Sequence, residues 1–139
     1  MSITKKNSPD SHPAERLYTL VKTLRGQDGC PWDMKQTPHT LKKHLLEETR
    51  ELAEAIEGSD PLHVCEEIGD LHFILTLLTL LYEEQKEFSV NDTWEGIIEK
   101  MIRRHPHVFS DKQVSSEEEL NAQWERIKAE EKQKNLKGL

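Results

Sequence analysis

Two long helical patterns meet at a very short connection, and this feature most constrains the fold. Thr37-Pro38 and Asp60-Pro61 each place a capping side chain directly before a proline, as at the start of a helix. Helical spacing of apolar residues follows the first pair as far as Gly58, and follows the second to about Glu84. Because so few residues separate the two helices, we expect them to pair as an antiparallel hairpin.

Three further helical segments flank this hairpin. The first ends near Gly26 and is followed by an expected loop, GQDGCPWDMKQ. The next runs from about Asn91 to Arg104 and stops at His105-Pro106. The last begins at Ser115 or Ser116 through a capping box. Since no alternating strand pattern is present, the sequence predicts an all-α helical bundle of about five helices around a central antiparallel helix pair.

The chain is long enough for one domain with its own core, at 139 residues. We expect residues 13–132 to form this domain, with disordered tails at 1–12 and 133–139. The net charge of −7 argues against a general nucleic-acid-binding protein, because such proteins need a basic surface.

The compartment is indicated by what the sequence lacks. The apolar run at 71–82 is too short to span a membrane and is interrupted by polar residues. The N-terminal residues do not contain the apolar stretch of a signal peptide. Two cysteines are too few for a disulfide framework and suit a reducing compartment. We therefore expect a cytoplasmic protein without membrane association.

Acidic residues occupy unusual positions on the first helix of the hairpin. At about 100° per residue, with Leu41 as the origin, Glu48 lies at about −20°, inside the apolar stripe. Glu51 lies at about −80°, at the edge of that stripe. The second helix carries Glu67 and Asp70 on one face, above an apolar strip. These carboxylates should face the interior or a cleft.

The two acidic pairs are placed symmetrically about the turn. Glu51 and Glu67 each lie eight residues from Ser59, and Glu48 and Asp70 each lie eleven residues from it. Four carboxylates at matched heights would repel one another unless a cation were bound. Oxygen ligands favour Mg²⁺, with Mn²⁺ as a substitute. A di-iron bundle would need Glu-x-x-His pairs, which are absent, whereas a solvated acidic face is the simpler alternative.

Basic and aromatic residues could contact an anionic ligand. Lys100 and Arg104 share a helix face, and Trp124 and Lys128 lie one turn apart on the last helix. Trp32, in the expected loop, could stack on a base. Simpler interpretations remain for each, because cations complement the end of a helix and either tryptophan could serve only in packing.

In order, these motifs resemble the MazG-type nucleoside triphosphate pyrophosphohydrolases, within the all-α NTP pyrophosphatase superfamily. The motifs are CPWD-x-x-QT, LLEE-x-x-E, EE-x-GDL, RRHPHVF and W-x-x-IK-x-x-EK, and they extend over about residues 15–132. The resemblance implies an Mg²⁺-dependent helical enzyme that forms a homodimer. Its expected reaction is hydrolysis of a nucleoside triphosphate to the monophosphate and pyrophosphate.

The resemblance also implies roles for individual residues. Glu48, Glu51, Glu67 and Asp70 would be the metal ligands, with Glu47 as a neighbouring catalytic acid that orients water. The residues expected to contact the nucleotide are Trp32, Lys100, Arg104, Trp124 and Lys128.

Two departures from the family pattern stand near these positions. Pro38 follows the QT of the first motif, and Arg50 lies inside EExxE. Neither is an expected metal ligand, but Pro38 leaves the choice of base open.

Two other functions remain as alternatives. The acidic residues could form the docking face of a non-catalytic helical interaction module. An enzyme that removes damaged nucleotides from the nucleotide pool would use the same chemistry on another substrate.

Overall fold

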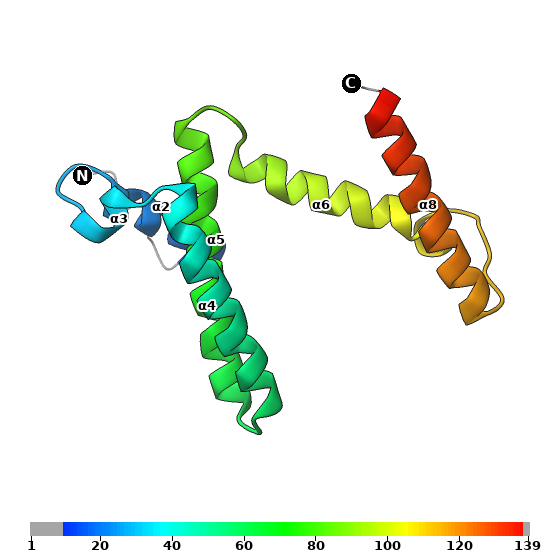
Figure 1. Cartoon of the computed structure of the whole chain (residues 1–139), viewed down its shortest axis with the longest axis horizontal. Coiled ribbons are helices and arrows are strands. Elements are labelled where there is room, and N and C mark those ends of the chain that lie inside the picture. The colour runs from blue at the N-terminus through cyan, green and yellow to red at the C-terminus, as the bar shows by residue number, and fades with distance from the viewer. Residues whose placement is uncertain (1–9, 138–139) are drawn as a thin grey trace. The chain divides into compact units, whose positions relative to one another are not determined.

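The computed structural model describes residues 10–137, which form seven α-helices and contain no β-strand. The described residues divide into two compact units, which meet between residues 90 and 91 of the chain (Figure 1). The all-α class is confirmed. The helices of the first unit are α2 (Pro13–Arg25), α3 (Pro31–Lys35), α4 (Pro38–Glu57) and α5 (Pro61–Glu84). Those of the second are α6 (Val90–Arg104), α7 (Pro106–Phe109) and α8 (Glu117–Lys137).

The predicted chain ends can be compared with the structure only in part. Residues 1–9 and 138–139, within the predicted tails, lie outside the described residues. Helix α8 continues to Lys137, five residues beyond the predicted end of the domain at residue 132. Within the described residues, no helix is both long and apolar enough to span a bilayer.

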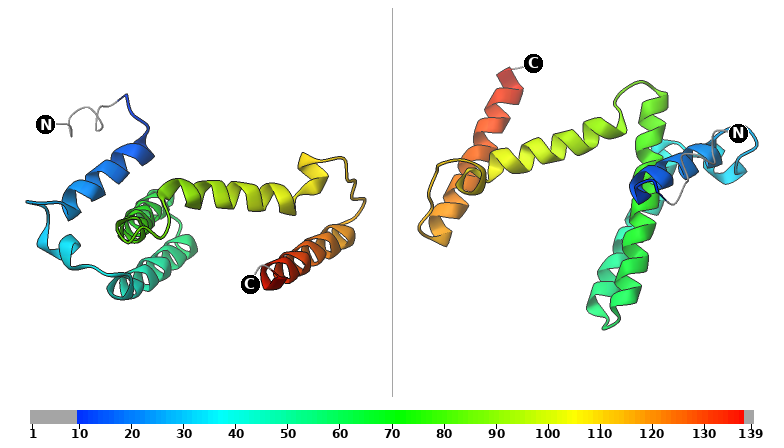
Figure 2. Two further views of the ribbon diagram at one scale, coloured as in Figure 1. Left: turned by 90° about the horizontal axis from the view of Figure 1, so that it is seen from above. Right: turned by 180° about the vertical axis from the view of Figure 1, so that it is seen from behind.

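Helices α4 and α5 form the predicted antiparallel hairpin, as Figures 1 and 2 show from three directions. The Thr37 side chain accepts a hydrogen bond from the Thr40 backbone N–H at 3.2 Å, and Thr40 Oγ1 accepts one from the Thr37 N–H. Asp60 Oδ1 accepts a hydrogen bond from the Leu62 N–H at 3.0 Å and caps α5. Both helix starts therefore lie where their capping residues place them.

The core of the first unit lies where α2 and α4 cover α5. Two polar contacts join α2 to the end of α5. Tyr18 donates a hydrogen bond to Glu83 at 2.7 Å, and Arg25 pairs with Glu84 at 2.9 Å. Burial and the Glu83 carboxylate raise the pKa of Tyr18 to about 12. The buried apolar core residues are Val21, Leu41, Ile74, Leu77, Leu80 and Leu81.

The expected loop between α2 and α4 contains the short helix α3, which was not predicted. Pro31 occupies its first turn, and Arg25 donates hydrogen bonds to the Asp33 and Met34 carbonyls at 2.7 and 3.0 Å. These carbonyls lie at the end of α3, where the helix itself leaves acceptors unpaired. A helix of five residues is too short to show a periodicity in the sequence.

The second unit begins and ends with long helices, α6 and α8. Ser116 Oγ accepts a hydrogen bond from the Glu119 N–H at 3.1 Å, which identifies Ser116 as the residue that caps α8. The Glu119 carboxylate accepts hydrogen bonds from the Ser115 backbone N–H and hydroxyl, and these lower the pKa of Glu119. The short helix α7 follows His105 and was not predicted separately.

Several apolar side chains are not covered within their own unit. Ile56, in the last turn of α4, is 62% exposed. Helix α6 has no buried residue. On α5, Ile68 and Leu75 are also exposed.

Candidate functional site

The hairpin brings four acidic side chains together in the first unit. Glu48 and Glu51 come from α4, and Glu67 and Asp70 come from α5. One carboxylate oxygen of each lies within 4.8 Å of the corresponding oxygens of the other three. The predicted convergence is therefore present, and its cause is the short turn, which sets both acidic pairs at equal distances along facing helices.

The cluster is partly removed from solvent. Glu67 is 7% exposed, and Glu48 is half-buried. Burial, as the main cause, and the neighbouring charges of Glu51 and Asp70 together raise the pKa of Glu48 to about 7. The pKa of Glu67 is raised by burial and by the same two charges. Crowded, poorly hydrated carboxylates thus disfavour their own ionised forms.

Two oxygens of the cluster are suited to an additional ligand. Glu48 Oε2 and Glu67 Oε2 are buried and have no hydrogen-bond partner in the described part of the chain. A divalent cation would satisfy these oxygens and offset the repulsion among the four groups. The donor set therefore fits a hard cation held by Glu48, Glu51, Glu67 and Asp70.

His63 belongs to the surroundings of this cluster but was not among the predicted site residues. Its Nε2 lies 3.3 Å from Glu67 Oε1, and this contact opposes the rise in the pKa of Glu67. His63 precedes Glu67 by four residues on the same helix face. That spacing was the available signal in the sequence.

Glu47 is not one of the four clustered carboxylates. Its carboxylate lies 3.8 Å from His44 Nδ1, and its side chain is 44% exposed. It lines an open groove on α4 together with basic residues on either side of it in the sequence. The groove residues are His39, Lys42, Lys43, Leu46, Glu47 and Arg50. Of the predicted substrate-contacting residues, Trp32 also lies in this unit, with its ring edge-on to His44 at 5.2 Å between centroids.

The other predicted substrate-contacting residues lie in the second unit. Arg104 lies over the Trp124 ring, with Cζ 5.3 Å from the ring centroid. It is also paired with Glu131 at 2.8 Å. Lys128 Nζ lies 3.6 Å from Glu125, and Lys100 is half-buried. The structure thus brings Arg104 and Trp124 into direct contact.

The fold and the carboxylate cluster define a class of protein: an all-α domain whose central helix pair presents four acidic side chains suited to a divalent cation. A family model described as the MazG nucleotide pyrophosphohydrolase domain matches residues 36–109. The chain belongs to this family. The matched segment contains all four clustered carboxylates.

Individual relatives agree with this assignment. The chain is 40% identical over 119 residues to the nucleoside triphosphate pyrophosphohydrolase of Escherichia coli (strain K12), covering 85% of this chain and 45% of that protein. It is 44% identical over 121 residues to the uncharacterized protein YabN of Bacillus subtilis (strain 168), covering 87% of this chain and 25% of YabN. The chain therefore spans less than half the length of these two curated relatives.

A solved structure confirms the fold. The crystal structure of a mazG-related protein from Thermotoga maritima superposes with a TM-score of 0.69 at 30% sequence identity. The match covers 83% of this chain and 98% of the other.

Proposed function

We propose that this protein hydrolyses nucleoside triphosphates, with ribose or deoxyribose, to the nucleoside monophosphate and pyrophosphate, with Mg²⁺ as the cofactor and Mn²⁺ as a substitute. The observation that carries the proposal is the cluster of four carboxylates within 4.8 Å, in which one buried oxygen each of Glu48 and Glu67 has no hydrogen-bond partner among the described residues. Membership of the MazG family and the names of its relatives support the reaction.

In the proposed mechanism, Glu48, Glu51, Glu67 and Asp70 hold the cation through carboxylate oxygens. When bound, Mg²⁺ supplies Lewis-acid chemistry, promoting ionisation of a water and neutralising charge on phosphate oxygens. Glu47 directly precedes Glu48 in the sequence, and its side chain is 44% exposed. We assign it the role of orienting the attacking water. His63 contacts Oε1 of Glu67 and would thereby orient this carboxylate.

The nucleotide contacts are assigned to the five residues that the sequence motifs indicate. Lys100, Arg104 and Lys128 would bind phosphate oxygens, since guanidinium and ammonium groups are the usual partners of phosphate. Trp124 and Trp32 would contact the nucleoside. Positioning of the triphosphate by such groups is a main source of rate in phosphoryl transfer.

A substrate panel tests this proposal. Pyrophosphate release is measured for each NTP and dNTP, and for a damaged nucleotide, with Mg²⁺, with Mn²⁺ and with excess EDTA. We expect release with either metal and none with EDTA. Absence of release from every substrate would contradict the proposal and favour a non-catalytic interaction module with an acidic docking face. Preference for the damaged nucleotide would indicate a role in clearing the nucleotide pool.

We further propose that the protein acts in the cytoplasm as a homodimer. Both cysteines, Cys30 and Cys65, are free thiols, as suits a reducing compartment. Helix α5 is apolar on nearly all sides, yet Ile68 and Leu75 are 43% and 48% exposed where α2 and α4 do not cover it. A second copy of the chain would bury this face.

A further inference from the structure

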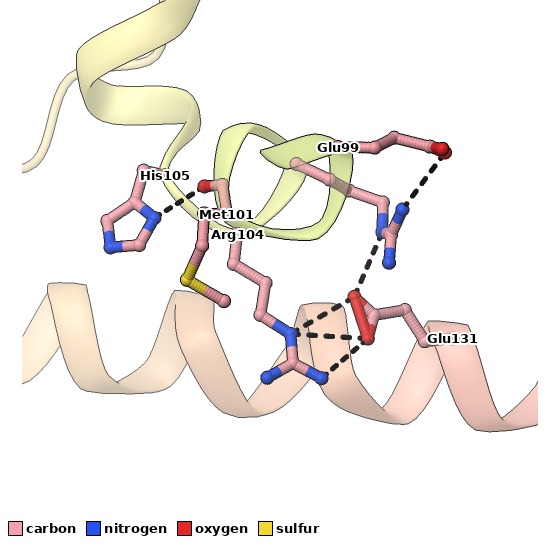
Figure 3. A network of polar contacts seen from close by, with 6 residues as sticks. Glu99, Met101, Arg104, His105 and Glu131 are labelled. Carbon is pink, nitrogen blue, oxygen red and sulfur yellow. Dashed lines mark hydrogen bonds and ion pairs between the residues drawn. The ribbon is translucent and has the colours of Figure 1, made fainter. Parts of the chain in front are cut away.

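Glu131 on α8 contacts Arg103 and Arg104 at the end of α6, and Figure 3 shows its contact with Arg104. Its Oε1 accepts hydrogen bonds from Arg104 Nη2 at 2.8 Å and from Arg104 Nε at 3.2 Å. Its Oε2 accepts hydrogen bonds from Arg103 Nε at 3.0 Å and from Arg104 Nε at 3.3 Å. The Arg104 and Glu131 side chains are only 15% and 17% exposed, so this pair is better shielded from solvent than a surface ion pair.

The contact uses one edge of the Arg104 guanidinium. Hydrogen bonds to Glu131 engage Nε and Nη2, which form the side edge of the fork. Within the described residues, Arg104 Nη1 makes no hydrogen bond, so the end edge formed by Nη1 and the second N–H of Nη2 has no protein acceptor there. An arginine can bind two acceptors in this way, because its five N–H donors have a fixed planar arrangement.

A third contact restricts the guanidinium further. Arg104 Cζ lies 5.3 Å from the Trp124 ring centroid, a cation–π distance. Trp124 is itself in edge-on contact with His105, with 5.3 Å between centroids. Residues 124 and 131 are seven apart, two turns along the same face of α8. The indole and the carboxylate therefore restrain the same side chain from one helix.

We propose that Glu131 is a positioning residue, which holds the Arg104 guanidinium so that its end edge can bind a phosphate oxygen of the substrate. This inference rests on the proposed function only in assigning a polyphosphate as the ligand of Arg104. The Glu131 carboxylate would repel an anion on its own, but by orienting Arg104 it strengthens anion binding.

The charges of the cluster agree with this role. The two arginines share Glu131, and Arg103 also pairs with the exposed Glu99, so Glu131 is the one carboxylate paired with Arg104 within the described residues. Hydrogen bonds from Arg104 and Arg103 lower the pKa of Glu131 to about 2, and the Arg104 pKa is raised by the same contact. Glu131 and Arg104 therefore remain ionised at neutral pH. If Glu131 competed with phosphate for Arg104, it would contact the end edge of the guanidinium. It contacts the side edge instead.

The test measures binding of inorganic tripolyphosphate, without metal, by isothermal titration calorimetry. In Glu131→Gln, the amide offers one acceptor and sets an NH₂ group against the arginines. We expect about tenfold weaker binding, although the substitution removes a negative charge. If only net charge mattered, removing the negative charge of Glu131 would instead strengthen the binding of tripolyphosphate. Binding equal to or tighter than that of the wild type would therefore overturn the inference.

A double-mutant cycle separates positioning from a merely structural role. Lysine at position 104 keeps the charge but has no side edge to hold, so Glu131→Gln should have no further effect in the Arg104→Lys background. An equal loss in both backgrounds would show that Glu131 acts through packing and would refute the inference. Glu99→Gln is the matched control, because Glu99 pairs with Arg103 at 3.3 Å and is 80% exposed; its binding should match the wild type.

The outcome can be separated from that of the proposed function. With a hydrolysed nucleotide, Glu131→Gln should raise KM about tenfold and change kcat much less. If the wild-type protein releases no pyrophosphate, the proposed function fails, while the tripolyphosphate titrations still decide the role of Glu131. If the wild-type protein does not bind tripolyphosphate, the inference itself fails. Circular dichroism of each variant verifies that α6 and α8 are folded.

Discussion

Each carboxylate of the cluster destabilises the metal-free fold but favours the binding of a cation. Glu67 lies almost out of solvent, and Glu48 has a buried oxygen with no hydrogen-bond partner in the described structure. Without a cation, these groups repel their neighbours and lack full hydration. With a cation, the same positions supply ligands already held close together. Substitutions here should therefore affect activity and stability in opposite directions.

At the residue scale, Glu48→Gln should reduce pyrophosphate release about a hundredfold or more, since it would remove one of the proposed metal ligands. The amide has nearly the same shape, so the helical circular dichroism signal should be unchanged. Glu54→Gln provides the control, because Glu54 is exposed on the same helix and should keep full activity. Near-wild-type turnover in Glu48→Gln would contradict the assignment of Glu48.

Also at this scale, Glu67→Gln should raise the Tm of the protein in EDTA. Burial and the charges of Glu51 and Asp70 raise the pKa of Glu67, so its ionised form destabilises the metal-free fold at neutral pH. The variant should also show a smaller increase in Tm on addition of Mg²⁺.

Differential scanning calorimetry with and without metal measures both effects. Glu66→Gln, at the exposed neighbouring position, should behave as the wild type. A lower Tm of Glu67→Gln in EDTA would mean that Glu67 stabilises the fold without a cation.

At the scale of the element, capping residues determine where α4 and α5 begin. Thr37→Ala removes an acceptor for the Thr40 N–H and should lower the free energy of unfolding by about 1 kcal/mol. Thr49→Ala is a matched control: its hydroxyl is exposed and only donates to the Leu45 carbonyl of its own helix. Urea denaturation compares the two, and equal stability of both variants would contradict the capping role.

The contact between α6 and α8 should depend on pH. Because the folded pKa of Glu131 is lowered to about 2, against an unfolded value of about 4.3, the ionised form stabilises the fold. This contribution is fully present above the unfolded pKa and is lost as the pH falls through about 2. An NMR titration of the Glu131 side-chain carboxyl measures the pKa directly. A midpoint near 4.3 would show that the contact with the arginines does not persist in solution.

At the scale of the whole molecule, the apolar surface of α5 is the main unexplained feature of the first unit. The helix is apolar around most of its circumference, and such helices are normally enclosed. Gly69, between the exposed Ile68 and the acidic Asp70, has no neighbouring atom within 4 Å of an added Cβ in the described structure. A partner helix could approach closely at this position.

Dimerisation can be tested on this face. Leu75→Glu should convert a wild-type dimer to a monomer, because the proposed interface would then bury an unpaired charge. Light scattering coupled to size-exclusion chromatography at micromolar concentration gives the masses. Leu75→Ala is the control that shortens the side chain without adding charge, and it should remain dimeric. A monomeric mass of the wild-type protein would exclude the dimer.

Sequence patterns were sufficient for the hairpin and for the convergence of its carboxylates. Thr37 and Asp60 cap helices through hydrogen bonds to residues two or three positions away, and such local interactions are visible in the sequence. The acidic pairs lie at equal distances from one turn, so the regular rise of a helix brings them level. By contrast, the two short helices, α3 and α7, contain too few residues to show a periodicity.

The amino-acid sequence by itself determined the all-α class, the central pair of helices and the meeting of four acids, since each follows from interactions within a helix or across one tight turn. Only the tertiary structure decided that His63 contacts Glu67 and that Glu131 is shared by two arginines. The last of these joins side chains 27 and 28 residues apart in sequence. Their contact depends on how the chain turns between α6 and α8, and no local pattern specifies that path.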